Sequence, residues 1–328
     1  MNKKIRYGIT GFGKFAELTI MPAINESPNS ELVAIQKRSL EAAKGKAKEY
    51  NIPLAFDSAE ELVKHPDVDA IFVVSPTCTH APETIAAAKA GKHIITEKPM
   101  AMNSAEAEQM IKTCKANNVK LMVAQMARFS PVNARIKELI NSGIIGDIKF
   151  AKAEFFYDVR NSHRWWSRDR KIAGGGPTYD IGVHCLDTLR FVLDDEVVST
   201  KSQMFPIPTE EKTELTSTLA LQFSQGTPAS IFISFAAPTS RIFIEIIGQE
   251  GTISAEKFSL SNLTVPLKIV KCQKGEVVET VNEDITVPNI YEKEVTHFSN
   301  CILNNLEPSI PGEEGLKNQI VLDTAMMV

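Results

Sequence analysis

The fold of the first part of the chain is decided by the stretch Ile5-Arg6-Tyr7-Gly8-Ile9-Thr10-Gly11-Phe12-Gly13-Lys14-Phe15-Ala16. Its beginning reads as a short buried strand, and residues 14–25 follow a helical pattern. A glycine loop between a strand and a helix lets backbone N–H groups at the helix N-terminus hold a pyrophosphate. The Gly-x-Gly-x-x-Ala pattern alone is common, so this context carries the assignment. The residues expected to bind a dinucleotide are Gly11, Phe12, Gly13, Lys14, Phe15 and Ala16.

Strand and helix patterns alternate up to about residue 125. Strand-length apolar runs follow at 32–36, 70–75, 93–96 and 121–124, and helical patterns lie between them at 39–50, 58–64, 79–90 and 104–117. Repeated alternation predicts a parallel, doubly wound α/β sheet with right-handed crossovers. We therefore expect residues 1–125 to form a Rossmann dinucleotide-binding domain.

The pattern changes after residue 125. Strand patterns lie at 148–159, 215–223, 230–236 and 241–247, and helical patterns at 132–142, from Pro177, at 291–306 and after residue 313. Consecutive strands joined by short turns predict a large open, mostly antiparallel sheet. Residues 126–328 are thus expected to form a second α/β domain for substrate binding and oligomerisation. Its sheet would have one face that its own helices cannot cover, which predicts a homodimer or homotetramer.

Length and composition narrow the class of protein. A chain of 328 residues suits two domains, and 43% hydrophobic with 23% charged residues is typical of a globular protein. The net charge of -4 argues against a nucleic-acid partner, and no apolar run approaches a membrane span. The five cysteines form no C-x-x-C pair, which indicates reduced thiols and no structural zinc. We expect a cytoplasmic protein that binds a small molecule.

The tripeptide Glu97-Lys98-Pro99 ends a strand of the first sheet. Carboxyl ends of parallel strands are where such sheets bind ligands, and a cation beside a nicotinamide can favour an alkoxide-like state of a substrate hydroxyl. The alternative is a solvated lysine at a strand end. The neighbouring residues expected to contact the cofactor at this edge are Ser75, Pro76, Thr77, His80 and Glu97.

Asp180 and His184 are four residues apart in one helical pattern, so both lie on one face. A carboxylate that hydrogen-bonds an imidazole keeps the ring basic, which suits a proton shuttle. An ordinary surface pair is about as compatible with these two residues alone. A metal site is a third interpretation, but no further ligand at suitable spacing supports it.

The end of the second strand carries Lys37, Arg38 and Ser39 where an acid would bind the ribose of NAD. Two cations and a hydroxyl suit a 2′-phosphate better than a ribose diol. The sequence thus favours NADP(H), with NAD(H) as the alternative cofactor. The competing interpretation is that these residues only begin an exposed helix.

Aromatic and basic residues of the second part can form a polar pocket of the kind that sugar rings favour. They are Arg128, Tyr157, Trp165 and Trp166, with His184 and Lys98 contributed by the catalytic set. Each one alone is more often a packing or surface residue.

Together these motifs resemble the glucose-fructose oxidoreductase / inositol dehydrogenase / rhizopine-catabolism (Gfo/Idh/MocA) family over nearly the whole chain. The specific part is Glu97-Lys98-Pro99 combined with Gly174-Gly175-Gly176 and the Asp180–His184 spacing. The resemblance implies that Lys98, Asp180 and His184 form a reactive triad acting on pyranoses, polyols or dihydrodiols. It also implies a second domain whose open sheet faces a neighbouring subunit.

Three functions are compatible with these residues. The first is an NADP(H)-dependent oxidoreductase that acts on a secondary alcohol or ketone of a sugar, polyol or dihydrodiol. The second is a glycoside hydrolase that oxidises its substrate transiently with a tightly held NAD, and Lys37 and Arg38 count against it. The third is a non-catalytic ligand sensor, which would be expected to lack the triad that this chain keeps.

Overall fold

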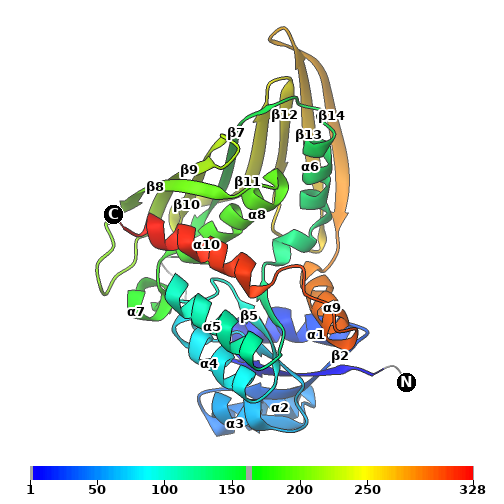
Figure 1. Cartoon of the computed structure of the whole chain (residues 1–328), viewed down its shortest axis with the longest axis vertical. Coiled ribbons are helices and arrows are strands. Elements are labelled where there is room, and N and C mark those ends of the chain that lie inside the picture. The colour runs from blue at the N-terminus through cyan, green and yellow to red at the C-terminus, as the bar shows by residue number, and fades with distance from the viewer. Residues whose placement is uncertain (1–2, 160–164, 328) are drawn as a thin grey trace. The chain divides into compact units, whose positions relative to one another are not determined.

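The computed structural model describes residues 3–159 and 165–327 (Figure 1). The chain divides into two compact units, one comprising Met1–Gln125 with Tyr291–Gln319, the other Met126–Ile290 with Ile320–Val328. The predicted second domain, residues 126–328, therefore differs from the structure in one segment. Residues 291–319 belong to the first unit, because their helix buries side chains there: the Tyr7 hydroxyl lies 2.7 Å from Ser299 Oγ.

The first unit is built on a six-stranded parallel sheet in the order β3-β2-β1-β4-β5-β6. Its strands are β1 (Ile5–Thr10), β2 (Ser30–Gln36), β3 (Leu54–Phe56), β4 (Ala70–Val73), β5 (His93–Glu97) and β6 (Leu121–Ala124). Its helices are η1 (Ala16–Ile20), α1 (Met21–Glu26), α2 (Leu40–Tyr50), α3 (Ala59–Lys64), α4 (Thr77–Lys89), α5 (Ser104–Ala116), α9 (Ile290–Leu303) and the larger part of α10 (Gly312–Ala325). The predicted doubly wound sheet is confirmed. The short β3 was not predicted.

The central strands of this sheet are buried on both faces. Every residue of β4 and β6 is buried, and Ile9 of β1 and Phe72 of β4 have no exposed surface. Crossover helices cover both faces of a parallel sheet, so its strands carry continuous rather than alternating apolar runs. This is the pattern that the sequence shows.

The second unit is built on an eight-stranded sheet in the order β14-β13-β12-β11-β7-β10-β9-β8. Its strands are β7 (Ile148–Asp158), β8 (Val197–Phe205), β9 (Thr216–Phe223), β10 (Pro228–Ser234), β11 (Ala236–Gly248), β12 (Gly251–Glu256), β13 (Leu263–Gln273) and β14 (Glu276–Val287). Its helices are η2 (Met126–Phe129), α6 (Pro131–Asn141), η3 (Trp165–Arg168), α7 (Arg170–Ala173), η4 (Thr178–Gly182) and α8 (Val183–Leu193). Among the described strands of this sheet, only β7 and β10 pair in parallel, so the predicted mostly antiparallel sheet is confirmed.

The two faces of the eight-stranded sheet differ. Figure 1 shows α6 and α8 on one face, where α8 contacts β7 and α6 contacts β14. Along β9, Leu219 and Leu221 are buried, while Thr218 before them and Ala220 between them are exposed. Alternation of this kind is expected where only one face packs on a core.

Within the described ranges, no helix is long and apolar enough to cross a membrane.

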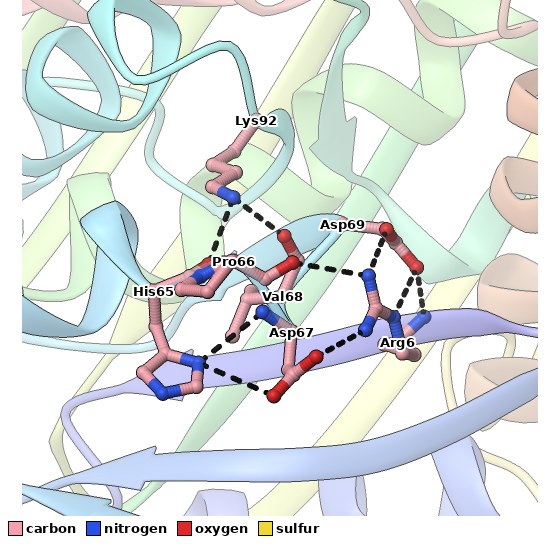
Figure 2. Close-up of polar contacts among 7 residues, drawn as sticks. All are labelled: Arg6, His65, Pro66, Asp67, Val68, Asp69 and Lys92. Carbon is pink, nitrogen blue, oxygen red and sulfur yellow. Dashed lines mark hydrogen bonds and ion pairs between the residues drawn. The ribbon is translucent and has the colours of Figure 1, made fainter.

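The amino ends of β1, β4 and β5 are joined by a polar cluster (Figure 2). Arg6 donates from Nε to Asp69 Oδ2 (3.0 Å) and from Nη2 to Asp69 Oδ1 (2.9 Å). Lys92 donates to the carbonyl oxygens of His65 (2.9 Å) and Val68 (2.7 Å). The cluster lies at the edge of the sheet opposite the glycine loop, so we interpret it as structural.

We predict that Asp69→Asn lowers the free energy of unfolding by about 1–2 kcal/mol at neutral pH, since it weakens a paired, charge-assisted contact. Burial raises the pKa of Asp69, but hydrogen bonds from Arg6 outweigh burial and lower it. A carboxyl with a lowered pKa stabilises the fold above its ordinary pKa, and this stability is lost as the pH falls. The difference in free energy of unfolding between Asp69→Asn and the unaltered protein should therefore shrink below about pH 4.

Asp67→Asn is the matched control. The Asp67 side chain is 65% exposed and accepts one hydrogen bond from Arg6 Nη1 (2.8 Å). Exposed ion pairs contribute roughly 0–1 kcal/mol, so this variant should unfold in urea almost as the unaltered protein does. If Asp69→Asn and Asp67→Asn lowered the free energy of unfolding equally, the Arg6–Asp69 pair would contribute no more to stability than the exposed Arg6–Asp67 pair.

Candidate active site

The candidate cofactor site lies where the order of the six-stranded sheet changes direction. β1 and β4 are neighbours in the sheet, although β2 and β3 lie between them in sequence. Ligands of open α/β sheets bind beyond the carboxyl ends of the strands at such a point. β1 is followed there by Gly11, and β4 by Val74 and Ser75.

Gly11 is required by the close approach of these two strand ends. Its φ is +72°, in the left-handed region that favours glycine, and a Cβ atom would lie 2.4 Å from the Cα of Ser75. Atoms cannot approach so closely, so a side chain at this position would force the two strand ends apart.

The backbone after Gly11 is held by the end of β2. Gly11 N–H donates to Gln36 Oε1 (3.0 Å), and Phe12 N–H donates to the Gln36 carbonyl (2.8 Å). The Phe12 carbonyl accepts a hydrogen bond from Lys37 Nζ (2.6 Å). The loop is therefore fixed by protein contacts.

The loop leads into a helix that begins at Lys14. Glu17 N–H donates to the Gly13 carbonyl (2.9 Å), so the N–H groups of residues 14–16 precede the first helical bond. Such groups, together with the close approach at Gly11, fit a pyrophosphate. Phe12 and Ala16 have buried side chains, whereas Lys14 and Phe15 are exposed.

The three polar residues after β2 have different surroundings. Lys37 is half-buried beneath the loop, and burial lowers its pKa while the charges of Lys46 and Arg38 act in the same direction. Ser39 caps α2, because its Oγ accepts from Ala42 N–H (3.3 Å). Arg38 is exposed and has no ion pair or hydrogen bond in the described part of the chain. Of the two cations after β2, Arg38 is therefore the one whose guanidinium is exposed to solvent.

The strand ends of β1 and β4 share a part-buried hydrogen-bond network with α4. Thr10 Oγ1 (2.5 Å) and Ser75 Oγ (2.8 Å) both donate to Glu83 Oε2. Thr79 Oγ1 donates to Ser75 Oγ (2.7 Å). Pro76 precedes α4, and Thr77 begins it with a buried side chain. The predicted segment 75–77, between β4 and α4, is thus held in place by hydrogen bonds of Ser75.

His80, predicted to flank the cofactor, is only 1% exposed. Its Nδ1 lies 2.9 Å from the carbonyl oxygen of Pro99, and its Nε2 lies 2.8 Å from that of Ser75. Burial lowers the pKa of His80, and the charge of Lys98 acts in the same direction. Both ring nitrogens contact the protein backbone, so contact with a cofactor stays a prediction.

The Glu-Lys-Pro motif follows β5 at the same edge of the sheet as the glycine loop. Glu97 is the last residue of β5 and is 9% exposed. Lys98 N–H donates to Glu97 Oε2 (3.2 Å), and the Lys98 side chain is half-buried. The geometry places the lysine at the carboxyl edge of the sheet, as the sequence predicted, and its contact with a ligand stays a prediction.

A second carboxyl group, Glu294 of α9, is fully buried in the first unit. Neither of its oxygens has a hydrogen-bond partner among the described residues. Burial raises its pKa well above the usual value, and the charge of Glu97 acts in the same direction.

Asp180 and His184 lie in the second unit at the junction of η4 and α8. The π-helical segment Thr178–Gly182 contains Asp180, and α8 begins one residue before His184. The predicted plain α-helical spacing is therefore altered, and single π-helical turns are frequent at functional sites. His184 is 6% exposed, and its ring lies 6.1 Å from that of Phe155, centroid to centroid.

The start of η4 is fixed by Glu214, which has no exposed surface. Its carboxylate accepts hydrogen bonds from the N–H groups of Gly176 (3.1 Å) and Thr178 (3.0 Å). A Cβ atom on Gly176 would lie 2.2 Å from the Glu214 carbonyl oxygen, so the close approach requires glycine. A carboxylate at a helix N-terminus also complements the helix dipole.

The predicted aromatic residues are partly accounted for. Tyr157 of β7 is half-buried, and its ring lies 5.9 Å from Phe155, which also faces His184. Trp166 of η3 is half-buried. The side chain of Trp165 lies outside the described residues. The structure thus brings Tyr157 and His184 into one aromatic row.

Arg128, predicted to bind substrate, forms an ion pair within the second unit. Its Nε and Nη2 donate to Oδ2 (2.9 Å) and Oδ1 (2.7 Å) of Asp187, which has no exposed surface. A bidentate pair of this kind fixes a guanidinium strongly. This contact serves the packing of η2 on α8, and contact of Arg128 with a substrate stays a prediction.

Four polar residues were missed by sequence reasoning: Gln36, Glu83, Glu214 and Glu294. Their partners are distant in sequence or absent, so no local pattern marks them. Gln36 is the exception, because it directly precedes the predicted Lys37. Among residues 3–159 and 165–327, no group of three or more His, Cys, Asp or Glu could hold a metal ion.

Comparison with known proteins gives a consistent result. The family model described as "Oxidoreductase family, NAD-binding Rossmann fold" matches residues 5–125, and the one described as "GFO/IDH/MocA C-terminal domain" matches residues 133–254. Trans-1,2-dihydrobenzene-1,2-diol dehydrogenase of Xenopus tropicalis is 32% identical over 93% of this chain and 91% of that protein.

Two further proteins are similar along nearly their whole length. D-xylose 1-dehydrogenase (NADP⁺) of Haloarcula marismortui is 25% identical over 95% of this chain and 87% of that protein. The crystal structure of aldose-aldose oxidoreductase from Caulobacter crescentus, complexed with glycerol, has a TM-score of 0.87 at 28% identity and covers 98% of this chain and 96% of that one.

Proposed function

We propose that this chain prefers NADP(H) and acts on a sugar, polyol or dihydrodiol. The chain belongs to the GFO/IDH/MocA oxidoreductase family and is an NAD(P)-dependent enzyme acting on CH–OH groups. The observation that carries this proposal lies within the first unit. Lys98 follows β5 at the same sheet edge where Gly11 follows β1, so a cation and a pyrophosphate-binding loop share one edge.

The proposed roles follow from the chemistry of the side chains. A bound nicotinamide supplies or accepts the hydride. Lys98 hydrogen-bonds the reacting oxygen and stabilises its developing negative charge, an interaction that is strongest in the transition state. His184 exchanges the proton of that oxygen, and Asp180 orients the imidazole and balances its charge.

The proposed substrate class is supported by the relatives and by the aromatic row. The relatives are named for a dihydrobenzenediol, D-xylose and aldoses. Tyr157 beside Phe155 and His184 offers an aromatic wall with a phenol hydroxyl, which suits a ring that carries hydroxyl groups. We propose Tyr157, Trp165 and Trp166 as substrate contacts.

For the cofactor, Arg38 is the proposed contact of the 2′-phosphate. Lys37 Nζ already donates to the Phe12 carbonyl, so Lys37 adds positive charge and support. The exposed guanidinium of Arg38 matches a phosphate in shape and charge.

We predict that Arg38→Leu weakens NADPH binding by roughly ten- to a hundredfold, since a charge-assisted contact contributes about 1.5–3 kcal/mol. NADH binding should stay nearly unchanged. Combined replacement, Lys37→Asp with Arg38→Leu, should erase or reverse the preference. The control Lys44→Leu removes the same charge from an exposed position of α2 and should have little effect. Titrations in which the unaltered protein binds NADH as tightly as NADPH would overturn the assignment.

We predict a homodimer or homotetramer that associates through the outer face of the eight-stranded sheet. On this face, the rings of Phe156 and Phe232 meet edge to face, with centroids 5.5 Å apart. The Arg241 guanidinium lies 4.0 Å over the ring of Phe243 and pairs with Glu154 (2.9 Å). Half-buried aromatic and arginine residues are typical of protein interfaces. Light scattering should show the oligomer at micromolar concentration, and a monomer would contradict the prediction.

The catalytic roles are tested by Lys98→Ala, His184→Ala and Asp180→Asn. Lys98→Ala should leave dinucleotide binding nearly intact but lower turnover severely, because the lost charge acts mainly in the transition state. His184→Ala should lower turnover by roughly 10²–10⁴-fold, and Asp180→Asn should slow the reaction through an unsuitable imidazole tautomer.

Single-turnover hydride transfer at saturating NADP(H) is the measurement. Lys89→Ala, at an exposed end of α4, is the control for the loss of a lysine and should retain the full rate. Unaltered rates in Lys98→Ala and His184→Ala would show that other residues handle the reacting oxygen.

A further inference from the structure

His80 connects the ends of two strands: Ser75 follows β4 beside the glycine loop, and Pro99 follows Lys98 after β5. Its Nδ1 lies 2.9 Å from the Pro99 carbonyl oxygen, directly after Lys98, and its Nε2 lies 2.8 Å from the carbonyl oxygen of Ser75. Ser75 is the residue that Gly11 approaches. One buried imidazole thus spans the cofactor loop and the Glu-Lys-Pro turn.

The two contacts differ in burial: the contact with the Pro99 carbonyl is buried, whereas that with the Ser75 carbonyl is part-buried. Ser75 is fastened by its own hydroxyl, which donates to Glu83 (2.8 Å) and accepts from Thr79 (2.7 Å). Pro99 is buried, and His80 is the only hydrogen-bond partner of its carbonyl in the described part of the chain. A buried carbonyl without a partner costs free energy, whereas water can reach a part-buried carbonyl, so the contact with Pro99 is the more costly one to lose.

We propose that His80 is a positioning residue that acts through Lys98: its Nδ1–H donates to the Pro99 carbonyl and fixes the turn from which the Lys98 side chain extends. The proposal depends on the proposed role of Lys98. It assigns His80 no contact with substrate. Small displacements of a catalytic group can lower a rate up to about a hundredfold, so an effect on turnover is expected although the imidazole does not react.

Two isosteric replacements separate the two contacts. The side-chain amide nitrogen of asparagine occupies the place of Nδ1, and that of glutamine occupies the place of Nε2. His80→Asn therefore retains a donor toward Pro99, whereas His80→Gln loses that donor and places its amide group toward Ser75. His80→Leu removes both ring nitrogens at similar volume.

The experiment compares these variants by single-turnover hydride transfer, dinucleotide affinity and thermal unfolding of the full chain. His80→Asn should stay within about threefold of the unaltered rate. His80→Gln should be slower by roughly tenfold or more, with dinucleotide affinity changed far less, because only the donor to Pro99 is lost. His80→Leu should be at least as slow as His80→Gln. If it does not fold, the two amide variants still decide.

A second comparison links the effect to Lys98. In a Lys98→Ala background, His80→Gln should cause no further loss of rate, because residues that act through one group are not additive. Equal rates in all His80 variants, rescue by glutamine but not asparagine, or a full additional loss in the Lys98→Ala background would overturn the proposal.

The same data distinguish this inference from the proposed function. An unaltered rate in Lys98→Ala would contradict the role of Lys98 and, with it, the action of His80 through Lys98. A low rate in Lys98→Ala together with an unaltered rate in His80→Gln would leave the proposed function standing and remove only the inference about His80.

Discussion

The carboxyl edge of the first unit depends on the close approach of Gly11 to Ser75. A single Cβ atom at Gly11 would lie 2.4 Å from the Ser75 Cα, so the two strand ends can meet only without a side chain. The surrounding polar groups maintain this approach. Gln36 holds the loop from one side, and Glu83 holds Ser75 from the other. The position of the candidate cofactor site follows from this contact between backbones.

Much of this arrangement could be predicted from sequence because its signals are local. The glycine loop between a strand and a helix predicted the first sheet, and the position of Lys98 after a strand predicted its place at the ligand-binding edge. The return of residues 291–319 to the first unit could not be predicted, because an amphipathic helix pattern does not identify its partner. Gly176 was predicted as part of a motif. The structure shows that glycine is required there because its backbone closely approaches Glu214, a residue far away in the sequence.

Positive charge at the site illustrates the same limit. Lys37 and Arg38 are equivalent in a sequence pattern, yet the structure separates them: Lys37 supports the Phe12 carbonyl and Arg38 stays open to solvent. Arg128 was predicted to bind substrate, and the structure adds a pair with the buried Asp187 that no sequence pattern indicated. Residue type and spacing predict which side chains are available for chemistry. Tertiary contacts decide which of them the fold itself uses.

The central claim is that this chain oxidises or reduces a hydroxyl-bearing substrate with NADP(H), using Lys98. It is tested most directly by following nicotinamide absorbance while a panel of sugars, polyols and dihydrodiols is mixed with NADP⁺ or NADPH, in parallel for the unaltered protein and Lys98→Ala. The account predicts a net change with at least one compound and its near-complete loss in the variant. No net change with any compound, or a change that persists at full rate in Lys98→Ala, would contradict it.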